Sequence, residues 1–284
     1  MSIDPGTSIG PVALTVRDLG DTREFYERAV GLRTLGDDGS AATLGGEDGR
    51  PLVELVRDPT APPRPRGTTG LFHLAILVPD RTELARSLRR AIEAGSRLAG
   101  ASDHLVSEAL YLADPEGNGI EIYRDRPRDR WRRDGDELRM ATLPLDLRDL
   151  IGELDPDAPL GALPAGARIG HVHLNVADLD EAERFYSGLL GFDVTAREYP
   201  GALFMSAGGY HHHLGVNTWM GEGAAKPPAD AVGLRSFAVE LPDAAEVERT
   251  VERLLARGAE VGRDDGSASV RDPSGNPVVL RARA

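Results

Sequence analysis

The chain contains an internal repeat, and this repeat limits the fold more than any other feature of the sequence. Residues 9–32 (IGPVALTVRDLGDTREFYERAVGL) and residues 169–192 (IGHVHLNVADLDEAERFYSGLLGF) are identical at ten of 24 positions, at a constant offset of 160. A second pair follows in the same order, GLFHLAILVPD at 70–80 and GLRSFAVELPD at 233–243. Self-similarity at a fixed spacing indicates that one structural unit recurs. The fold must therefore be built from like segments in two halves.

Each repeated segment is typical of a strand that leads into a helix. Apolar residues alternate with others at the start of each segment, as in a half-buried strand. An acid followed by a second acid three residues later marks helix starts after Asp80, Asp178 and Asp243. The turns DPEGN at 114–118 and DPSGN at 272–276 each separate two short strands. We therefore predict four β-α-β-β-β modules and an α+β fold.

The ends of two helices can also be predicted. The helix after Asp80 should run to about Ala94 and stop at Gly95, because glycine is the usual residue just past a helix end. The helix after Asp178 should end before Gly191.

The modules are expected to form two domains. A length of 284 residues suits two domains of ordinary size. We predict an N-terminal domain at 8–125 with modules 1 and 2, a linker at 126–167, and a C-terminal domain at 168–284 with modules 3 and 4. The basic run at 124–133 alternates with aspartate, and we favour a solvated linker with salt bridges over a site for a nucleic acid or phosphate.

The composition excludes several classes of function. The chain has no cysteine, so any metal must be held by histidine, aspartate or glutamate. A formal net charge of −13 disfavours nucleic acids and anionic lipid. No stretch approaches the roughly 20 apolar residues of a membrane span, and no secretory signal is visible. We expect a cytoplasmic protein that binds neither nucleic acid nor membrane.

The histidines are concentrated in a few places. Three lie on the predicted first strands of modules 2 and 3, one precedes a strand of module 2, and three form a triplet in GGYHHHLGVNTW: His73, His171, His173, His104, His211, His212 and His213. Taken singly, a histidine on a strand is more often structural than a ligand. We place the triplet inside a strand, where alternation would send its first and third members to one face.

Glu121 lies in the middle of a predicted strand, between two isoleucines. Burying a lone carboxylate is expensive, so we expect a cationic group beside it. On another predicted strand, His73 shares a face with Ala75 and Leu77.

Together these segments resemble the vicinal-oxygen-chelate superfamily, which includes glyoxalase I, bleomycin-resistance proteins and extradiol dioxygenases. The repeated strand-Asp-Leu-helix-Phe-Tyr pattern and the turn DPEGNGIEIY carry the resemblance. The stretches TGLFHLAILVPDRTEL, DHLVSEALYLADPEGNGIEIYRDRP, IGHVHLNVADL and SAGGYHHHLGVNTW extend it to the two-domain catechol 2,3-dioxygenases of bacilli. It implies modules paired into cupped half-barrels around one metal.

The resemblance also implies a set of metal ligands. Extradiol enzymes of this family use a histidine from each of two first strands and a glutamate from one last strand. If modules 2 and 3 pair, these positions are His73, His171 and Glu121. Pairing of modules that are adjacent in sequence is the competing geometry, and it would need a third ligand such as His104 or Glu54.

The implied activity is the cleavage of a catechol-type ring by dioxygen at iron(II), to a yellow muconic semialdehyde; the same ligands also suit manganese(II). The resemblance gives His104 and Tyr111 catalytic roles and places His173 and His213 in the wall of the substrate pocket. The expected partners are a small aromatic diol and dioxygen. The fold often self-associates, which leaves a homo-oligomer open.

Two other functions remain open at this point. A metal isomerase or lyase of the glyoxalase kind would ask for a second carboxylate, and Glu54 at the metal with a preference for nickel or zinc would support it. A drug-binding protein of the bleomycin-resistance kind would not be an enzyme. Such proteins commonly lack the ligand set described above.

Overall fold

The computed structural model describes residues 2–135 and 137–283. Contacts divide the chain into two compact units: unit 1, with Met1–Val12, Pro62–Phe72 and Gly170–Ala284, and unit 2, with Ala13–Ala61 and His73–Ile169. Three of the four unit boundaries fall inside strands: β1 (Ser8–Val16), β5 (Gly70–Leu77) and β12 (Arg168–Asn175). The domain limits expected from the repeat, 8–125 and 168–284, stay a prediction.

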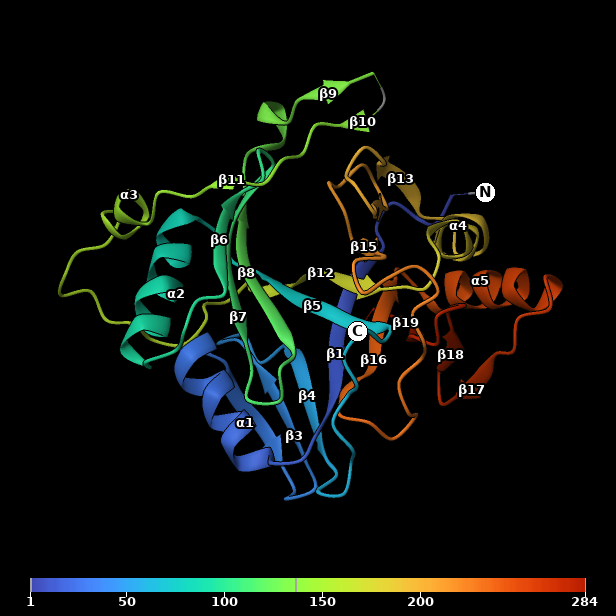
Figure 1. Cartoon of the computed structure of the whole chain (residues 1–284), viewed down its shortest axis with the longest axis horizontal. Helices are drawn as coiled ribbons and strands as arrows, with labels where there is room; N and C mark the ends of the chain where they lie inside the picture. Colours follow the sequence, from blue (N-terminus) through green and yellow to red (C-terminus); the bar gives the residue numbers. More distant parts are fainter. Residues whose placement is uncertain (1, 136, 284) are drawn as a thin grey trace. The chain divides into compact units, whose positions relative to one another are not determined.

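Unit 2 contains modules 1 and 2. Besides parts of β1 and β5, its module elements are α1 (Leu19–Phe25), η1 (Tyr26–Val30), β2 (Arg33–Asp37), β3 (Ala41–Gly45), β4 (Pro51–Arg57), α2 (Arg81–Glu93), β6 (Gly100–Asp103), β7 (Ser107–Ala113) and β8 (Gly119–Asp125). Strands pair in the orders β4-β3-β2 and β6-β7-β8-β5, antiparallel except that β5 runs parallel to β8. Helix α1 packs on β3 and β4, and α2 packs on β7 and β8 (Figure 1).

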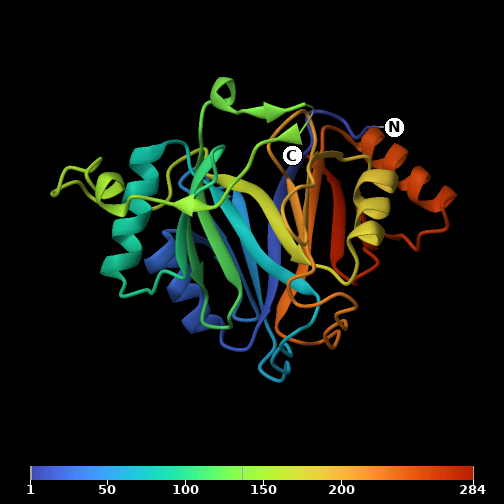
Figure 2. The same ribbon diagram turned by 45° about the horizontal axis from the view of Figure 1, so that its top comes forward.

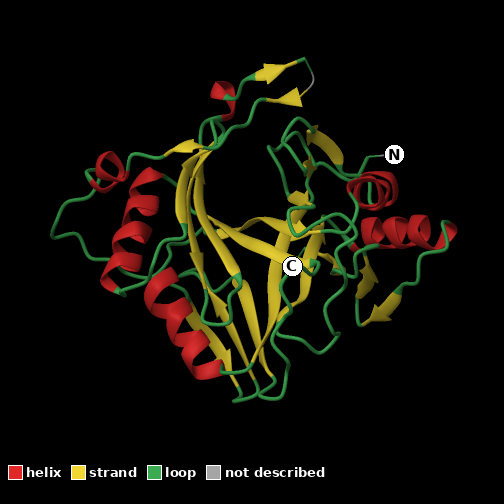
Figure 3. Ribbon diagram, in the orientation of Figure 1, coloured by secondary structure: helices red, strands yellow, loops and turns green. Residues whose placement is uncertain are grey.

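Unit 1 contains modules 3 and 4, with the same arrangement. Besides β12, its elements are α4 (Leu179–Glu183), η3 (Arg184–Leu189), β13 (Asp193–Ala196), β14 (Ala202–Ser206), β15 (Leu214–Asn217), β16 (Gly233–Leu241), α5 (Ala244–Ala256), β17 (Gly262–Asp264), β18 (Ser267–Arg271) and β19 (Pro277–Ala282). Strands pair in the orders β12-β15-β14-β13 and β17-β18-β19-β16. Helix α4 packs on β14 and β15, and α5 packs on β16, β18 and β19 (Figure 3).

The predicted α+β fold of four β-α-β-β-β modules is therefore confirmed. In each module one helix covers one face of a small sheet, and the first and last strands run parallel and side by side where the registers are described. No helix in the described part of the chain has the length and apolar character needed to cross a membrane.

The helix boundaries follow the predicted signals. Asp80, Asp178 and Asp243 cap their helices by accepting a hydrogen bond of 2.8 Å from the backbone N–H three residues on. Helix α2 ends at Glu93, and Gly95 follows with a φ of +70°. Helix α4 passes into the π-helical segment η3, which ends before Gly191. Both predicted helix ends are confirmed.

A buried hydrogen bond joins the modules within each unit. Tyr26, in η1, donates to Asp114 at 3.4 Å, and Tyr186, in η3, donates to Asp272 at 2.9 Å. Both tyrosines are 0% exposed, and burial raises the pKa of each hydroxyl well above its ordinary value. The tyrosine of each repeated Phe-Tyr motif is thus hydrogen-bonded to the aspartate of an Asp-Pro turn. The internal repeat did not predict this contact.

The segment predicted as a linker is packed against module 2. It contains η2 (Arg128–Arg130), β9 (Arg133–Asp134), β10 (Glu137–Leu138), β11 (Leu143–Pro144) and α3 (Leu147–Ile151). Strand β11 extends the sheet at β6, and α3 packs on α2. Arg81 fixes α3 through ion pairs of 2.6 Å to Asp149 and Glu153. In Figures 1 and 2 the hairpin β9–β10 lies beyond the ends of β7 and β8.

Candidate metal centre

His73 and Glu121 face each other on neighbouring strands of unit 2. Strands β5 and β8 run parallel with Ala75 opposite Glu121, and alternate side chains of a strand project to the same face. His73 Nε2 lies 3.0 Å from Glu121 Oε2, and the two residues are 6% and 3% exposed. A carboxylate buried this closely against an imidazole needs a positive charge, which either a proton on the ring or a shared metal ion can supply.

The surroundings of this pair are apolar and aromatic. Ala75 and Leu77 form one cluster with Ala109 and Tyr123, and Tyr111 packs against it. This is the strand face that the sequence predicted for His73. A low local dielectric strengthens the interaction of any ion bound there with its ligands.

Tyr111 connects the pair to His104. Tyr111 lies directly opposite Glu121 in the β7–β8 ladder, and its ring is 5.8 Å from that of His73. Its hydroxyl is 2.6 Å from His104 Nε2, and His104 Nδ1 is 2.8 Å from the carbonyl of Ala141. A carbonyl can only accept, so Nδ1 carries a proton, and in the neutral ring Nε2 accepts from the Tyr111 hydroxyl.

The turn that carries His104 has an unusual backbone. The next residue, Leu105, has a φ of +69°, a left-handed conformation that costs a residue with a side chain about 1–2 kcal/mol. Its N–H donates to Asp103 at 2.9 Å, and the N–H of His104 donates to the carbonyl of Ser107 at 2.8 Å. Strain of this kind often persists at functional sites, where neighbouring contacts enforce it.

Unit 1 holds the other predicted histidines. His171 and His173 are buried on β12, where His173 lies opposite Gly215 of β15. A Cβ at residue 215 would lie 2.9 Å from the His173 ring, so only glycine leaves that ring its place. The His173 ring also contacts those of Phe72 and Trp219, at centroid distances of 5.2 and 5.3 Å.

The prediction that the histidine triplet lies inside a strand is wrong. Strand β15 begins at Leu214, and the triplet belongs to the connection from β14. The positive φ angles of Gly208 and Gly209 turn the chain before it can extend. Neighbouring histidine rings therefore contact each other instead of projecting to opposite faces of a strand: His211 Nδ1 and His212 Nδ1 are 2.8 Å apart.

Two members of the triplet contact the surroundings of β12. His212, for which we predicted no role, lies against His171 with ring centroids 4.1 Å apart. His213 accepts a hydrogen bond of 3.1 Å from the N–H of Ala207 and lies 4.9 Å from the ring of Tyr210. The pocket roles of His173 and His213 stay predictions.

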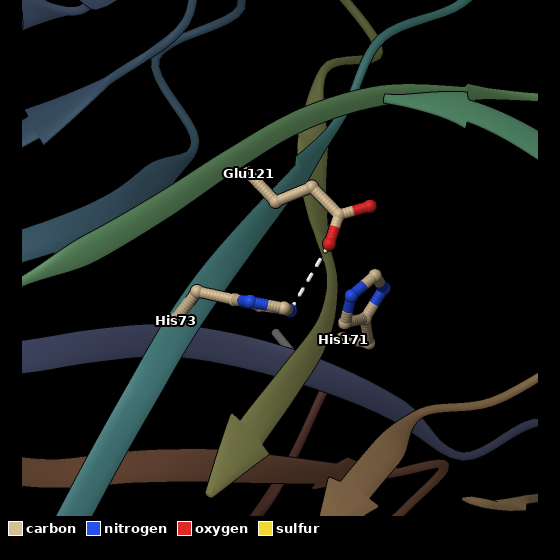
Figure 4. Close-up of side chains that lie close together, drawn as sticks. All are labelled: His73, Glu121 and His171. Atoms are coloured by element: carbon tan, nitrogen blue, oxygen red, sulfur yellow. Dashed lines mark ion pairs between the residues drawn. The ribbon is translucent and has the colours of Figure 1, made fainter. Parts of the chain in front are cut away.

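Three of the described side chains form a group that could hold a metal ion. His73, Glu121 and His171 each offer one ligand atom, and these atoms lie within 4.8 Å of one another (Figure 4). Two ligands that bind one ion at right angles, each at about 2.1 Å, are about 3.0 Å apart, which matches the His73–Glu121 distance of 3.0 Å. Two imidazoles and a carboxylate suit a divalent transition metal.

Glu54, the second carboxylate that a glyoxalase-type isomerase would ask for, is exposed on β4. It lies opposite Thr43 in the β3–β4 ladder. Among the described residues, it is not part of the group that could hold a metal.

Comparisons with known proteins agree with these observations. The family model of the Glyoxalase/Bleomycin resistance protein/Dioxygenase superfamily matches residues 8–122 and 168–280. A catechol-2,3-dioxygenase of Bacillus subtilis (strain 168) is 44% identical over 276 residues, 96% of each chain.

Solved structures share the fold at low sequence identity. A protein of Bacillus subtilis subsp. subtilis str. 168, provisionally described as a dioxygenase, has a TM-score of 0.70 at 14% identity, over 99% of this chain and 86% of that one. Glyoxalase I from Zea mays has a TM-score of 0.58 at 18% identity, over 97% and 92%.

Proposed function

The chain belongs to the Glyoxalase/Bleomycin resistance protein/Dioxygenase superfamily, and from this we propose that it is an iron(II)-dependent extradiol dioxygenase that cleaves a catechol with dioxygen. The observation that carries the proposal is the buried group of two histidines and one glutamate. The full-length relative named as a catechol-2,3-dioxygenase supports it.

The donor set favours this chemistry over hydrolysis or isomerisation. Two histidines and one carboxylate on one side of an ion leave neighbouring positions open, as in non-haem iron(II) oxygenases. When bound, the metal supplies the redox chemistry that lets a diol and dioxygen react while both occupy these positions. A single carboxylate leaves the centre with net positive charge, which favours an anionic catecholate as ligand.

We propose that His73 and Glu121 of module 2 share the ion with His171 of module 3. The donor set supports this, because two imidazoles and one carboxylate suit a divalent transition metal.

His104 and Tyr111 are proposed to move the proton of the substrate. His104 Nδ1 is held by the Ala141 carbonyl, so Nε2 is the atom left to take a proton. The Tyr111 hydroxyl, 2.6 Å away, can pass a proton from a catechol oxygen to Nε2. A histidine is the natural base for this step near neutral pH.

The aromatic side chains of unit 1 are proposed to form the wall of the substrate pocket. Phe72 and Trp219 pack edge-to-face at 5.2 Å, and His173 contacts both rings. Such walls bind an aromatic ring through edge and face contacts. His213 is proposed to complete this wall.

The test is a ring-cleavage assay. The protein is loaded with iron(II) without oxygen, then mixed with catechol and air. Yellow ring-cleavage product is expected from the wild type. The rate should fall by at least about a hundredfold in His73→Ala, Glu121→Ala and His171→Ala, because losing a metal ligand should cost no less than losing a side chain that only orients one. Glu54→Ala, which removes an exposed carboxylate of the same unit, is expected to keep the activity.

Two outcomes would contradict the proposal. Full activity in Glu121→Ala would show that the carboxylate is not a ligand. A glyoxalase-type isomerase would be favoured if the wild type turned over methylglyoxal–thiol adducts in place of catechol and Glu54→Ala lost that activity. Comparing iron(II) with manganese(II) in the same assay identifies the metal that supports turnover.

A further inference from the structure

A pocket of about 420 Å³ in unit 2 is lined by eight residues, of which four are arginine. It lies where the turn between β6 and β7 meets the segment after β8. Four guanidinium groups, those of Arg126, Arg130, Arg132 and Arg139, share it with one carboxylate, that of Asp103. We define these residues, with the apolar residues described below, as the arginine pocket.

Most of the positive charge in the arginine pocket is not neutralised. Arg126 pairs with Asp103 at 2.7 Å and with Glu108 at 3.0 Å. Within the described part of the chain, the side chains of Arg130, Arg132 and Arg139 make no ion pair. In a protein with 46 acidic and 33 basic residues, acids are abundant enough to pair with most arginines. Three arginines that line one cavity, whose single carboxylate already pairs with Arg126, are therefore available to an anionic ligand.

The backbone holds two of these arginines in place. The N–H of Arg139 donates to the carbonyl of Arg132 at 2.9 Å and closes the β9–β10 hairpin at its base. The Trp131 indole, next to Arg132, donates to the carbonyl of Arg126 at 2.9 Å. The backbone at Arg132 and Arg139 is thus anchored at the base of the hairpin, which lowers the entropy lost when these two side chains bind a ligand.

The rest of the pocket is apolar. Leu105, Ala141 and Leu143 line it, so a ligand can place hydrocarbon there while its charge meets the arginines. Leu105 is the residue with the strained backbone, and Ala141 is the residue whose carbonyl holds His104. The pocket thus shares residues with the support of His104.

We propose that the arginine pocket binds a small organic oxyanion, a carboxylate or phosphate on an apolar stem. Arginine presents a planar fork of donors that matches both groups, which makes it the preferred residue for binding them. This binding does not depend on a metal or on the proposed dioxygenase activity.

The test is calorimetric titration of the full chain at low salt with benzoate, phenyl phosphate and neutral benzamide. Either anion is expected to bind at least about tenfold more tightly than benzamide, because hydrogen bonds to a charged group are the stronger ones. The ratio of the two anion affinities identifies which headgroup the pocket prefers. Added salt should weaken the binding of both anions and leave the binding of benzamide unchanged.

Variants assign the binding to the pocket. The double variant Arg132→Gln/Arg139→Gln is expected to bind the preferred anion about tenfold or more weakly than the wild type. Arg97→Gln/Arg257→Gln removes the same charge from arginines that do not line the pocket and should change the affinity less than about twofold, because solvent and salt screen charges that lie away from the bound anion. Asp103→Asn removes the only carboxylate of the pocket and should tighten binding.

Several results would overturn the proposal. They are failure of both anions to bind the wild type, equal binding of benzamide, and equal losses in the two double variants. Loss of binding in His73→Ala would place the anion at the metal centre instead. The His73→Ala arm thus separates failure of this inference from failure of the proposed function.

Discussion

At the scale of single residues, His104 and Tyr111 form a pair whose proposed task can be separated from metal binding. Tyr111→Phe removes the hydroxyl that lies 2.6 Å from His104 Nε2, and His104→Ala removes the proton acceptor. Each is expected to lower kcat by about a hundredfold, the usual contribution of a positioned base. Kinetics with the iron content measured for each variant checks this.

The double variant provides the control for this prediction. If the two side chains act as one relay, the double variant should be no slower than the worse single variant. Independent losses that multiply, or loss of bound iron in Tyr111→Phe, would contradict a shared role in proton transfer.

Sequence reasoning reached this pair only in part. The resemblance named both residues, and the structure brings them into contact, but their catalytic roles stay predictions. The carbonyl that sets the tautomer of His104 belongs to Ala141, 37 residues away along the chain. Nothing local in either segment signals this contact, because it depends on how the segment after β8 folds back.

At the scale of elements, the buried tyrosine–aspartate bonds join two modules in each unit. Tyr26→Phe and Tyr186→Phe leave a buried carboxylate with one donor fewer, so each should lower the free energy of unfolding, by about 1–3 kcal/mol. The loss should be larger for Tyr186→Phe, because its bond is 2.9 Å long compared with 3.4 Å for Tyr26. Urea unfolding of both variants measures the difference, and a larger loss in Tyr26→Phe would contradict the argument.

The carboxyl of Asp272 should make stability depend on pH. Burial raises its pKa above the ordinary value of 3.8, so the folded state holds this proton more tightly than the unfolded state. Its contribution to stability is present below the ordinary pKa and is lost as the pH rises through the folded pKa. The free energy of unfolding of the wild type minus that of Asp272→Asn should therefore fall between pH 4 and pH 7, as measured by urea unfolding.

Asp48 offers a control of opposite sign. Backbone hydrogen bonds from Arg50 and Gly166 lower its pKa below 3.8. Its contribution is present above the ordinary pKa and is lost as the pH falls through the folded value. The free energy of unfolding of the wild type minus that of Asp48→Asn should stay constant from pH 5 to pH 7 and fall only at acidic pH. Parallel curves for the two variants would contradict both assignments.

The elements also show where reading a sequence locally succeeds. Caps such as Asp80 and stops such as Gly95 act within one turn of helix, so their prediction needed no tertiary information. The run at 124–133 was predicted to form salt bridges, and Arg124 and Arg126 do so with Glu108. Arg130, in the same run, lines a cavity instead, together with Arg132 and Arg139 from the base of the hairpin that follows.

At the scale of the whole molecule, a shared metal ion should stabilise the entire fold. An ion that binds only the folded state raises stability by RT ln(1 + [L]/Kd), about 2.7 kcal/mol at a hundredfold excess over Kd. Manganese(II), which does not oxidise in air as readily as iron(II), should raise the Tm of the wild type in proportion to the logarithm of its concentration. Scanning calorimetry measures this shift.

Removing the ligand from module 3 tests whether both units take part. His171→Ala should have a Tm that hardly responds to manganese(II), while Glu54→Ala should respond like the wild type. A full response in His171→Ala would mean that the ion binds His73 and Glu121 without it, and the competing pairing of sequence-adjacent modules would then be favoured.

The repeat predicted four modules because identical positions can be counted in the sequence alone. It did not predict that the contact boundaries fall inside β1, β5 and β12, because a repeat reports likeness between segments and not which segments touch. For the same reason the ligand positions His73 and His171 could be named from the repeat, whereas their binding of one shared ion stays a proposal.

The interleaved composition of the units has a consequence for synthesis on the ribosome. All of unit 2 has been translated once residue 169 is made, so it can fold while the rest of the chain is still being produced. Unit 1 needs residues 1–12 and 62–72 together with 170–284. Those two early stretches can complete unit 1 only after residues 170–284 have been translated, so a chaperone that shields nascent chains is expected to act on them in the meantime.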